Sequence, residues 1–525
     1  MEYKTESLSD LKIRVGEDIN QLLRVNLYEI GLSEKEQKRL RIRKHELREA
    51  LNQCGLGDLK AKDYVKTVIE DILVGKYHYG EEQWNLLIPF ECPMQLTAQD
   101  KFQILLYCYE QKRGAEAFSE FMDRNHILDK MADKKQGYCI DDDMVEEIYQ
   151  KERPFLTAAD KKAVIVQEIY ASLRGLGVID ALRDMRIDGV SGGVSGKEGD
   201  FHSVWVFFRG ITMHLKCLSF GNARELERIC LNIYRYGNPG QFSKARGYIV
   251  NEMKDRSRVV VVRPPFAESF AFFVRKFDTM EKKSLEELIT GPRSELPIDL
   301  IRYIVQGCQV TAVTGAQGSG KTTLLMGMVG FIHPSFTLRI QEMAFELHLR
   351  DIYPDRNILT FRETDTVSGQ EGLDVQKKTD GVVNILGEVA TAEVAAYLIQ
   401  MSQVGSLFTL FTHHARTTDS LIKYMRNSLL SCGLFRDEQI AKEQVVECIR
   451  FDIHLEKDME GHRYVERISE ICPEKDGYRI EELVRYEEGE YVFCHPLSLE
   501  TCKEMEKHMT KEDRREFVES RYIPV

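Results

Sequence analysis

One short segment constrains the fold of this chain more than any other, a glycine-rich loop between two apolar runs. Residues 309–314 have the composition of a short buried strand, and residues 323–331 that of a helix. The loop between them reads Gly315, Ala316, Gln317, Gly318, Ser319, Gly320, Lys321, Thr322, and Thr323 follows it. Strand, glycine turn and helix in this order predict an α/β domain with a largely parallel sheet.

The same loop predicts phosphate binding. Its glycines allow backbone N–H groups to converge on phosphate oxygens, and the helix that follows contributes the partial positive charge of its amino terminus. We expect Lys321 to reach the β and γ phosphates of a nucleoside triphosphate such as ATP, and the Thr322 hydroxyl to bind Mg²⁺. The alternative is a glycine-rich turn without a ligand.

Acidic residues follow two further predicted strands. Residues 382–386 precede Glu388, which we expect to hold the water shell of the metal; it could instead cap the next helix. Residues 337–341 precede Glu342 and Glu346, which would share one face if a helix began there. Glu342 lies nearer the strand end and is the better candidate for the catalytic base, the alternative being an ordinary surface acid.

A histidine pair follows the predicted strand 407–411, in the order Thr412, His413, His414, Ala415. A histidine beside the γ phosphate could sense whether that phosphate is present. Paired histidines alone are weak support, and a metal site would need further ligands that the sequence does not place.

The remaining sequence suggests four domains. Residues 1–150 are predicted to be a helical extension, with the acids at 141–143 capping a helix rather than binding a cation. Residues 155–280 are predicted to form a small α+β domain, with a helix capped by Thr157 and strands at 203–208, 258–262 and 271–274. Its glycine-rich segment 189–199 is predicted to be a turn or mobile loop. A P-loop domain would cover residues 281–475, and a strand and helix extension residues 476–525.

Composition argues against some classes of protein. The formal net charge of −12 is unlike that of a dedicated nucleic-acid binder, so no nucleic-acid partner is expected. No run approaches the roughly 18 apolar residues that span a bilayer, so any membrane role should go through a partner. The 12 cysteines include no C-x-x-C pair, as is typical of a reduced cytosolic protein.

The order of these motifs resembles the type II/type IV secretion-system ATPases, most closely the Tad/Flp pilus branch, over residues 156–471. The matching elements are the Walker A loop at 315–323, the Asp box at 342–347, the Walker B pair Gly387-Glu388 with Glu393, and a His box at 404–415 that contains His414. The resemblance implies a RecA-like P-loop ATPase domain preceded by a small α+β domain and a helical N-terminal extension. It also implies that Glu342, Glu388 and His414 are catalytic.

Upstream, Arg246, Arg258 and the segment Val274-Arg275-Lys276-Phe277 resemble the arginine-bearing strands of the small domain in that family. The resemblance implies a homohexameric cytoplasmic ring at the inner face of a bacterial membrane, acting on a polytopic platform protein. Arg246, Arg258 and Arg275 would then complete the phosphate cage when the small domain closes, although a strand arginine serves as often in a structural ion pair.

Several positions depart from the family pattern. Met343 stands where an aspartate is usual, Ala390 and Ser406 replace an arginine and a histidine, and a usually arginine-bearing stretch reads Gln376 to Asp380, with Lys378 within it. Lysine lacks the planar fork with which arginine grips a phosphate. These changes leave open a nucleotide-binding assembly subunit with little turnover. A nucleic-acid translocase built on the same core is the third functional hypothesis, after the ATPase motor and the assembly subunit.

Overall fold

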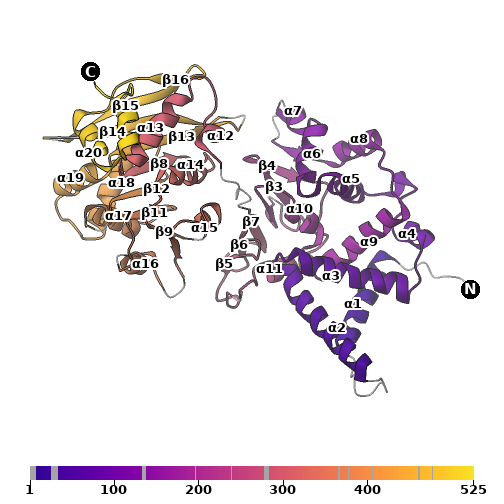
Figure 1. Ribbon diagram of the computed structural model, residues 1–525. Helices are drawn as coiled ribbons and strands as arrows, with labels where there is room; N and C mark the ends of the chain where they lie inside the picture. The colour runs from indigo at the N-terminus through magenta and orange to yellow at the C-terminus, as the bar shows by residue number, and fades with distance from the viewer. Residues whose placement is uncertain are drawn as a thin grey trace, which may run out of the picture. The chain divides into compact units, whose positions relative to one another are not determined.

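The computed structural model describes residues 7–24, 34–132, 137–195, 197–237, 239–276, 283–343, 345–364, 367–376, 378–404, 406–458, 461–475 and 477–524. The chain divides into two compact units, residues 1–278 and 279–525 (Figure 1). Each unit has its own sheet and its own core.

The first unit contains a mixed sheet, whose seven strands within the described residues lie in the order β1-β4-β3-β2-β7-β6-β5. Its strands are β1 Cys139–Ile140, β2 Gly189–Gly192, β3 Val204–Phe208, β4 Ile211–Leu215, β5 Tyr248–Glu252, β6 Arg258–Val262 and β7 Ala271–Arg275. All neighbours except β1 and β4 run antiparallel. The predicted strands at 203–208, 258–262 and 271–274 are therefore present, within a residue at each end.

The prediction of a turn or mobile loop for residues 189–199 is wrong at its start, because Gly189–Gly192 form the buried central strand β2. The glycines serve close packing here. A Cβ on Gly189 would lie 2.3 Å from the Val274 carbonyl oxygen, and one on Gly192 within 2.6 Å of the Phe220 and Phe272 rings. Glycine in a strand marks such an approach as well as a turn.

Helices surround this sheet and share one apolar core with it. They are α1 Leu8–Arg24, α2 Glu34–Gln53, α3 Leu59–Glu70, α4 Glu81–Leu87, α5 Ala98–Arg113, α6 Ala117–Arg124, α7 Ile127–Ala132, α8 Asp142–Glu152, α9 Ala158–Leu173, α10 Asp180–Asp184 and α11 Ala223–Ile233. The predicted helix caps are confirmed: the Asp141 side chain accepts from the Met144 backbone N–H, and Thr157 from that of Asp160. The acids at 141–143 therefore start a helix.

The second unit contains a nine-stranded sheet, within the described residues, in the order β10-β9-β11-β12-β8-β13-β14-β15-β16. Its strands are β8 Thr311–Gly315, β9 Leu338–Glu342, β10 Ile358–Arg362, β11 Val383–Leu386, β12 Phe408–His413, β13 Phe451–Lys457, β14 Arg463–Glu474, β15 Gly477–Glu487 and β16 Glu490–Phe493. The strands from β10 to β13 are parallel and the rest antiparallel. The glycine-rich loop leaves β8, which lies between β12 and β13.

Helices cover both faces of this sheet, in three layers. They are α12 Leu285–Leu288, α13 Glu295–Gln306, α14 Lys321–Met328, α15 Leu349–Ile352, α16 Gly369–Gln376, α17 Ala392–Val404, α18 Thr418–Ser431, α19 Glu438–Cys448, α20 Leu499–His508 and α21 Lys511–Val518. One core joins the sheet to α13, α14 and α20, the other to α17, α18 and α19. Val313 faces the first core and Ala312 the second, as the alternation of a doubly covered strand requires.

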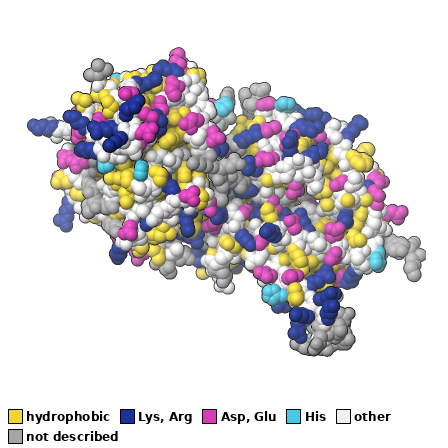
Figure 2. Space-filling model, viewed as in Figure 1, with side chains coloured by type: hydrophobic (Ala, Val, Ile, Leu, Met, Phe, Trp, Pro, Cys, Tyr) yellow, Lys and Arg dark blue, Asp and Glu magenta, His cyan; other side chains and the backbone are white. Residues whose placement is uncertain are grey.

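The predicted fold class is confirmed: an α/β RecA-like domain with its glycine loop between strand and helix follows an α+β region and helices. The four-domain division at residues 150, 280 and 475 stays a prediction, because unit 1 includes the N-terminal helices and unit 2 the C-terminal elements. Within the described residues, none of the helices has both the length and the apolarity needed to cross a membrane. Figure 2 shows one face of the molecule, on which acidic and basic side chains are interleaved and basic side chains gather along α2.

Candidate nucleotide site

The glycine-rich loop turns sharply between β8 and α14. Gly315, Gly318 and Gly320 have φ angles of +140°, +79° and +97°, in the region that favours glycine. A Cβ on Gly315 would come within 2.3 Å of the Leu455 carbonyl oxygen on the neighbouring strand β13. The loop therefore needs glycine both for its backbone conformation and for its close packing against β13.

Lys321 is the first residue of α14, and its side chain folds back over the loop. Its Nζ donates hydrogen bonds to the carbonyl oxygens of Gly315 at 3.0 Å and Ala316 at 2.8 Å. Burial lowers the pKa of this ammonium to about 8, and the Glu388 carboxylate opposes the shift. The cation thus lies at the loop that sequence analysis identified as a phosphate cradle, with Thr322 and Thr323 beside it in the first turn of α14.

Three side chains from the ends of three parallel strands meet at this loop. Lys321 Nζ lies 3.3 Å from His414 Nδ1, and His414 Nε2 lies 3.2 Å from Glu388 Oε1. Lys321 follows β8, His414 follows β12 and Glu388 follows β11, and these strands are neighbours in the order β11-β12-β8. Parallel strands place their carboxyl ends on one edge, where α/β sheets bind ligands. Three of the predicted residues therefore form one connected group.

Glu342 ends β9, on the far side of β11 from β12, and is buried. Its Oε1 accepts hydrogen bonds from the backbone N–H groups of Glu346 at 3.0 Å and Leu347 at 2.9 Å. The expectation of a helix that places Glu342 and Glu346 on one face is wrong. Glu342 is the last residue of β9, and its carboxylate accepts hydrogen bonds from the loop that follows. Its role as a base stays a prediction.

The two histidines of the pair lie in different surroundings. His413 is buried, and its Nδ1 lies 2.8 Å from the Val389 carbonyl oxygen while its ring packs on Tyr424. Burial lowers the pKa of His413. His414 is half-exposed beside Lys321. Of the two, His414 is the one that contacts Lys321 of the loop.

On the other side of β8, the structure adds residues that sequence analysis did not identify. The Thr314 hydroxyl, one residue before the loop, lies 2.6 Å from Asp452 Oδ1 and 2.8 Å from His454 Nδ1, both on β13. Arg463, the first residue of β14, donates from Nε to the Gly318 carbonyl oxygen at 2.9 Å. Asp452, His454 and Arg463 come far after the loop in the sequence, and the pairing of β13 with β8 and with β14 brings them to it.

The predicted arginines of the small domain lie in the first unit. Arg258 starts β6 and Arg275 ends β7, directly opposite each other in the antiparallel register. Arg246 lies in the loop before β5. Phe277, which belongs to the same sequence resemblance, lies outside the described residues. A part for these arginines in a phosphate cage stays a prediction.

No protein-family model matches the chain, and no curated protein matches it. Among solved structures, it is similar to the VirB11 ATPase of the Brucella suis type IV secretion system in complex with sulphate (18% identity, TM-score 0.30, covering 54% of this chain and 89% of that one). It is also similar to the Legionella pneumophila ATPase DotB (14%, 0.38, 63% and 82%) and the pilus retraction motor PilT with bound ADP (14%, 0.40, 66% and 97%). Similarity at this level does not assign a function.

Proposed function

We propose that this chain is an ATP-hydrolysing motor subunit of a type II/type IV secretion or Tad-type pilus assembly machine. The observation that carries the proposal is the connected group Lys321–His414–Glu388, at the carboxyl ends of three adjacent parallel strands. This group lies against the glycine-rich loop 315–322, called the phosphate-type loop below. The motif order along the chain supports the secretion and pilus class, and the site chemistry supports the nucleotide.

The residues present fit Mg²⁺-ATP. The loop backbone is shaped by glycines with positive φ, and Lys321 places a cation where phosphate oxygens would lie. Thr322 and Glu388 supply the hydroxyl and carboxylate oxygens that Mg²⁺ prefers. When bound, Mg²⁺ neutralises charge that develops on the β and γ phosphates.

In the proposed reaction, water attacks the γ phosphorus and the bond to the bridging oxygen of ADP breaks. Glu342 accepts the proton of that water, and Lys321 stabilises charge on the phosphates. His414 donates from Nε2 to Glu388 and accepts from Lys321 at Nδ1. Movement of Lys321 from the loop carbonyls to a phosphate therefore changes the partners of His414, which makes His414 suitable as a sensor.

The proposed assembly is a homohexameric cytoplasmic ring at the inner face of the membrane, acting on a polytopic platform protein. Arg246, Arg258 and Arg275 of the first unit would add positive charge to the phosphates when the two units close on ATP. Hydrolysis would then release the closed state, and the ring would pass the movement to the platform.

Steady-state phosphate release and ATP binding should be measured on the full chain, on Lys321→Ala and on Lys503→Ala, an exposed lysine of α20 that serves as the matched control. We expect wild type and Lys503→Ala to bind ATP and turn it over, and Lys321→Ala to do neither. Equal turnover by wild type and Lys321→Ala would reject the enzyme. Mass measurement with and without ATP tests the ring.

A second candidate is a nucleotide-binding assembly subunit with little turnover. The observation that favours it is the buried amide pair in which Gln376 Nε2 donates to Gln341 Oε1 at 2.9 Å. At position 376 the sequence thus has a neutral side chain held inside the unit, in a stretch where the resembling family carries arginines. Tight ATP binding with turnover no faster than that of Lys321→Ala would support this candidate.

A further inference from the structure

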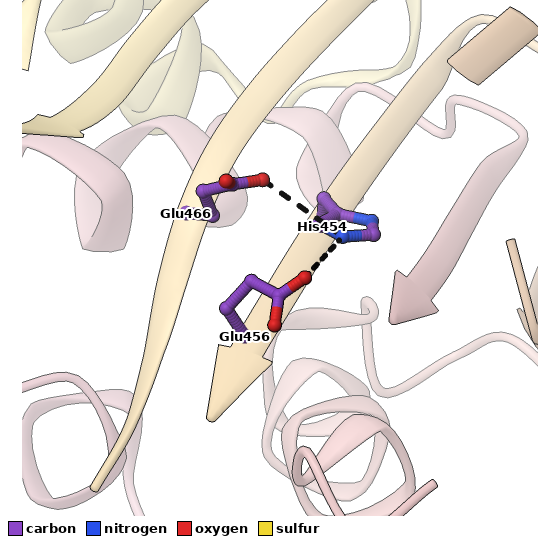
Figure 3. A group of neighbouring side chains, drawn as sticks. All are labelled: His454, Glu456 and Glu466. Atoms are coloured by element: carbon purple, nitrogen blue, oxygen red, sulfur yellow. Dashed lines mark hydrogen bonds and ion pairs between the residues drawn. The ribbon is translucent and has the colours of Figure 1, made fainter. Parts of the chain in front are cut away.

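A cluster of three possible metal ligands lies next to the phosphate-type loop, on the side away from His414. His454 and Glu456 are two residues apart on β13, and Glu466 extends toward them from β14 (Figure 3). His454 Nε2 lies 3.4 Å from Glu456 Oε1 and 3.8 Å from Glu466 Oε2, and all three donor atoms lie within 4.8 Å of one another. The imidazole is 1% exposed, whereas the carboxylates are 38% and 37% exposed.

Hydrogen bonds at Nδ1 of the His454 imidazole determine that its other nitrogen, Nε2, carries a lone pair toward the carboxylates. Asp452 accepts from the Thr314 hydroxyl at one oxygen and from the Thr418 hydroxyl at the other, at 2.6 and 2.7 Å. Because the Thr314 hydroxyl has a single hydrogen, its 2.8 Å contact with His454 is a bond that Nδ1–H donates. Nε2 of the neutral ring therefore presents its lone pair to two carboxylates.

Three electron-rich atoms that converge at a partly buried place attract positive charge. Arg467 supplies part of it at Glu466 Oε2, and a proton on Nε2 or a metal ion can supply the charge between Nε2 and the two carboxylates. The second case has a geometric requirement: ligands at about 2.0–2.2 Å from one ion in tetrahedral geometry lie about 3.4 Å apart. The two distances from Nε2, 3.4 and 3.8 Å, are close to that separation before any adjustment of the carboxylate rotamers.

The donor set selects the class of metal. Ca²⁺ and Mg²⁺ prefer oxygen ligands alone, and softer ions prefer thiolates, whereas one imidazole with two carboxylates suits borderline ions such as Zn²⁺. The chain Asp452–Thr314–His454 Nδ1 matches the outer hydrogen bonds that orient a metal-binding imidazole. Arg467 also contacts Glu466 Oε2, but a carboxylate has enough lone pairs to bind a guanidinium and an ion together.

We propose that His454, Glu456 and Glu466 form a binding site for one divalent borderline transition metal ion, with Zn²⁺ as the test ion. The site is separate from the Mg²⁺ site proposed at Thr322 and Glu388. The exposed sides of the two glutamates give the ion a path from solvent and room for a water as the fourth ligand.

The location gives such an ion a defined effect. His454 is hydrogen-bonded to Thr314, and Thr314 is the residue that immediately precedes Gly315 of the loop. Through Glu466 and Arg467, whose Nη2 donates to the Arg416 carbonyl oxygen at 3.0 Å, the site is joined to the segment that follows His414. A bound ion would fix β13 against β14, from which Arg463 reaches Gly318. It would thereby hold two sides of the nucleotide site in place.

The test uses the full chain, freed of metal with a chelator and kept free of nucleotide. Zn²⁺ binding is measured by calorimetry, and retained metal by elemental analysis after desalting. We expect one ion per chain, at least about tenfold weaker binding in Glu456→Gln and Glu466→Gln, and none in His454→Ala. His495→Ala, which removes an exposed histidine 3.6 Å from Glu481, is the control and should bind as wild type does.

If His454→Ala fails to fold, Glu456→Gln still tests the site, because it keeps the size of a partly exposed side chain and should not disturb the fold. Replacing Zn²⁺ with Co²⁺ adds a spectroscopic check on the 12 cysteines. Visible bands without a near-ultraviolet thiolate band are expected. The proposal is overturned if wild type retains no Zn²⁺, if both glutamine variants bind as wild type does, or if the thiolate band is present.

Discussion

The Nε atom of Arg463 donates a 2.9 Å hydrogen bond to the carbonyl oxygen of Gly318, 145 residues earlier in the chain. This bond joins the start of β14 to the middle of the phosphate-type loop. It also uses Nε only, and an arginine has further N–H donors on its planar fork. An exposed arginine held in this way is positioned to add charge at the loop as well as to brace it.

We therefore expect Arg463→Ala to weaken ATP binding about tenfold, the scale of one hydrogen bond to a charged group. Titration with a fluorescent ATP analogue measures the change. Arg479→Ala is the matched control, since Arg479 is an exposed arginine on β15 whose Nε contacts Glu474 at 3.1 Å. If the two variants bind the ATP analogue with equal affinity, Arg463 takes no part in nucleotide binding.

Glu342→Gln should separate binding from turnover. The glutamine keeps an Oε1 atom that can accept the N–H groups of Glu346 and Leu347, so the fold of the loop should be preserved. It cannot accept a proton from water, so we expect ATP hydrolysis to fall by about 10² to 10⁴ while ATP affinity stays within about twofold. Single-turnover kinetics measure both quantities, and Glu346→Gln, with near wild-type turnover expected, is the control.

The pH dependence of ATP binding should report Lys321. Its pKa of about 8 in the nucleotide-free chain means that the ammonium is lost as pH rises through 8. Phosphate oxygens favour the charged form, so binding above this pH takes up a proton and becomes weaker by up to about tenfold per pH unit. Affinity should change little between pH 7 and 8. Lys321→Arg, which stays charged throughout, should lack the decline above pH 8.

The stability of the first unit should depend on the glycines of β2. In Gly192→Ala the new methyl group meets the Phe220 and Phe272 rings, so we expect a loss of about 1–3 kcal/mol in the free energy of unfolding. Urea denaturation followed by far-ultraviolet circular dichroism measures it. Gly75→Ala is the control: apart from its chain neighbours and the backbone of its own helix, no heavy atom lies within 4 Å of the added carbon, so no steric loss is expected.

The elements with strong local signals could be predicted from the sequence. The strand before Gly315, the helix caps at Asp141 and Thr157, and the strand 258–262 depend on residues close in sequence, and the structure has them. The buried strand β2 was missed because its glycines are selected by contacts with residues far along the chain, the backbone of Val274 and the ring of Phe272. Local propensity carries no information about such contacts.

The candidate site shows the same division. Short motifs with fixed residue types and spacing predicted the loop, Glu342, Glu388 and His414 as candidate site residues. His454 and Arg463 could not be identified, because their place beside the loop follows from the register in which β13 pairs with β8. An alternating His454-x-Glu456 pattern in a strand was the only local signal, and a strand with polar residues is usually just an exposed one.

The pairing of β8 with β13 has a consequence for the order in which the chain folds during synthesis. The strand that leads into the loop is flanked on one side by β12 and on the other by β13, whose residues 451–455 are made about 140 residues after it. Until the ribosome has released β13, one edge of β8 and the backbone of Gly315 lack their neighbour. The loop should therefore acquire its shape late, and a nascent chain arrested before residue 451 should not be retained on immobilised ATP.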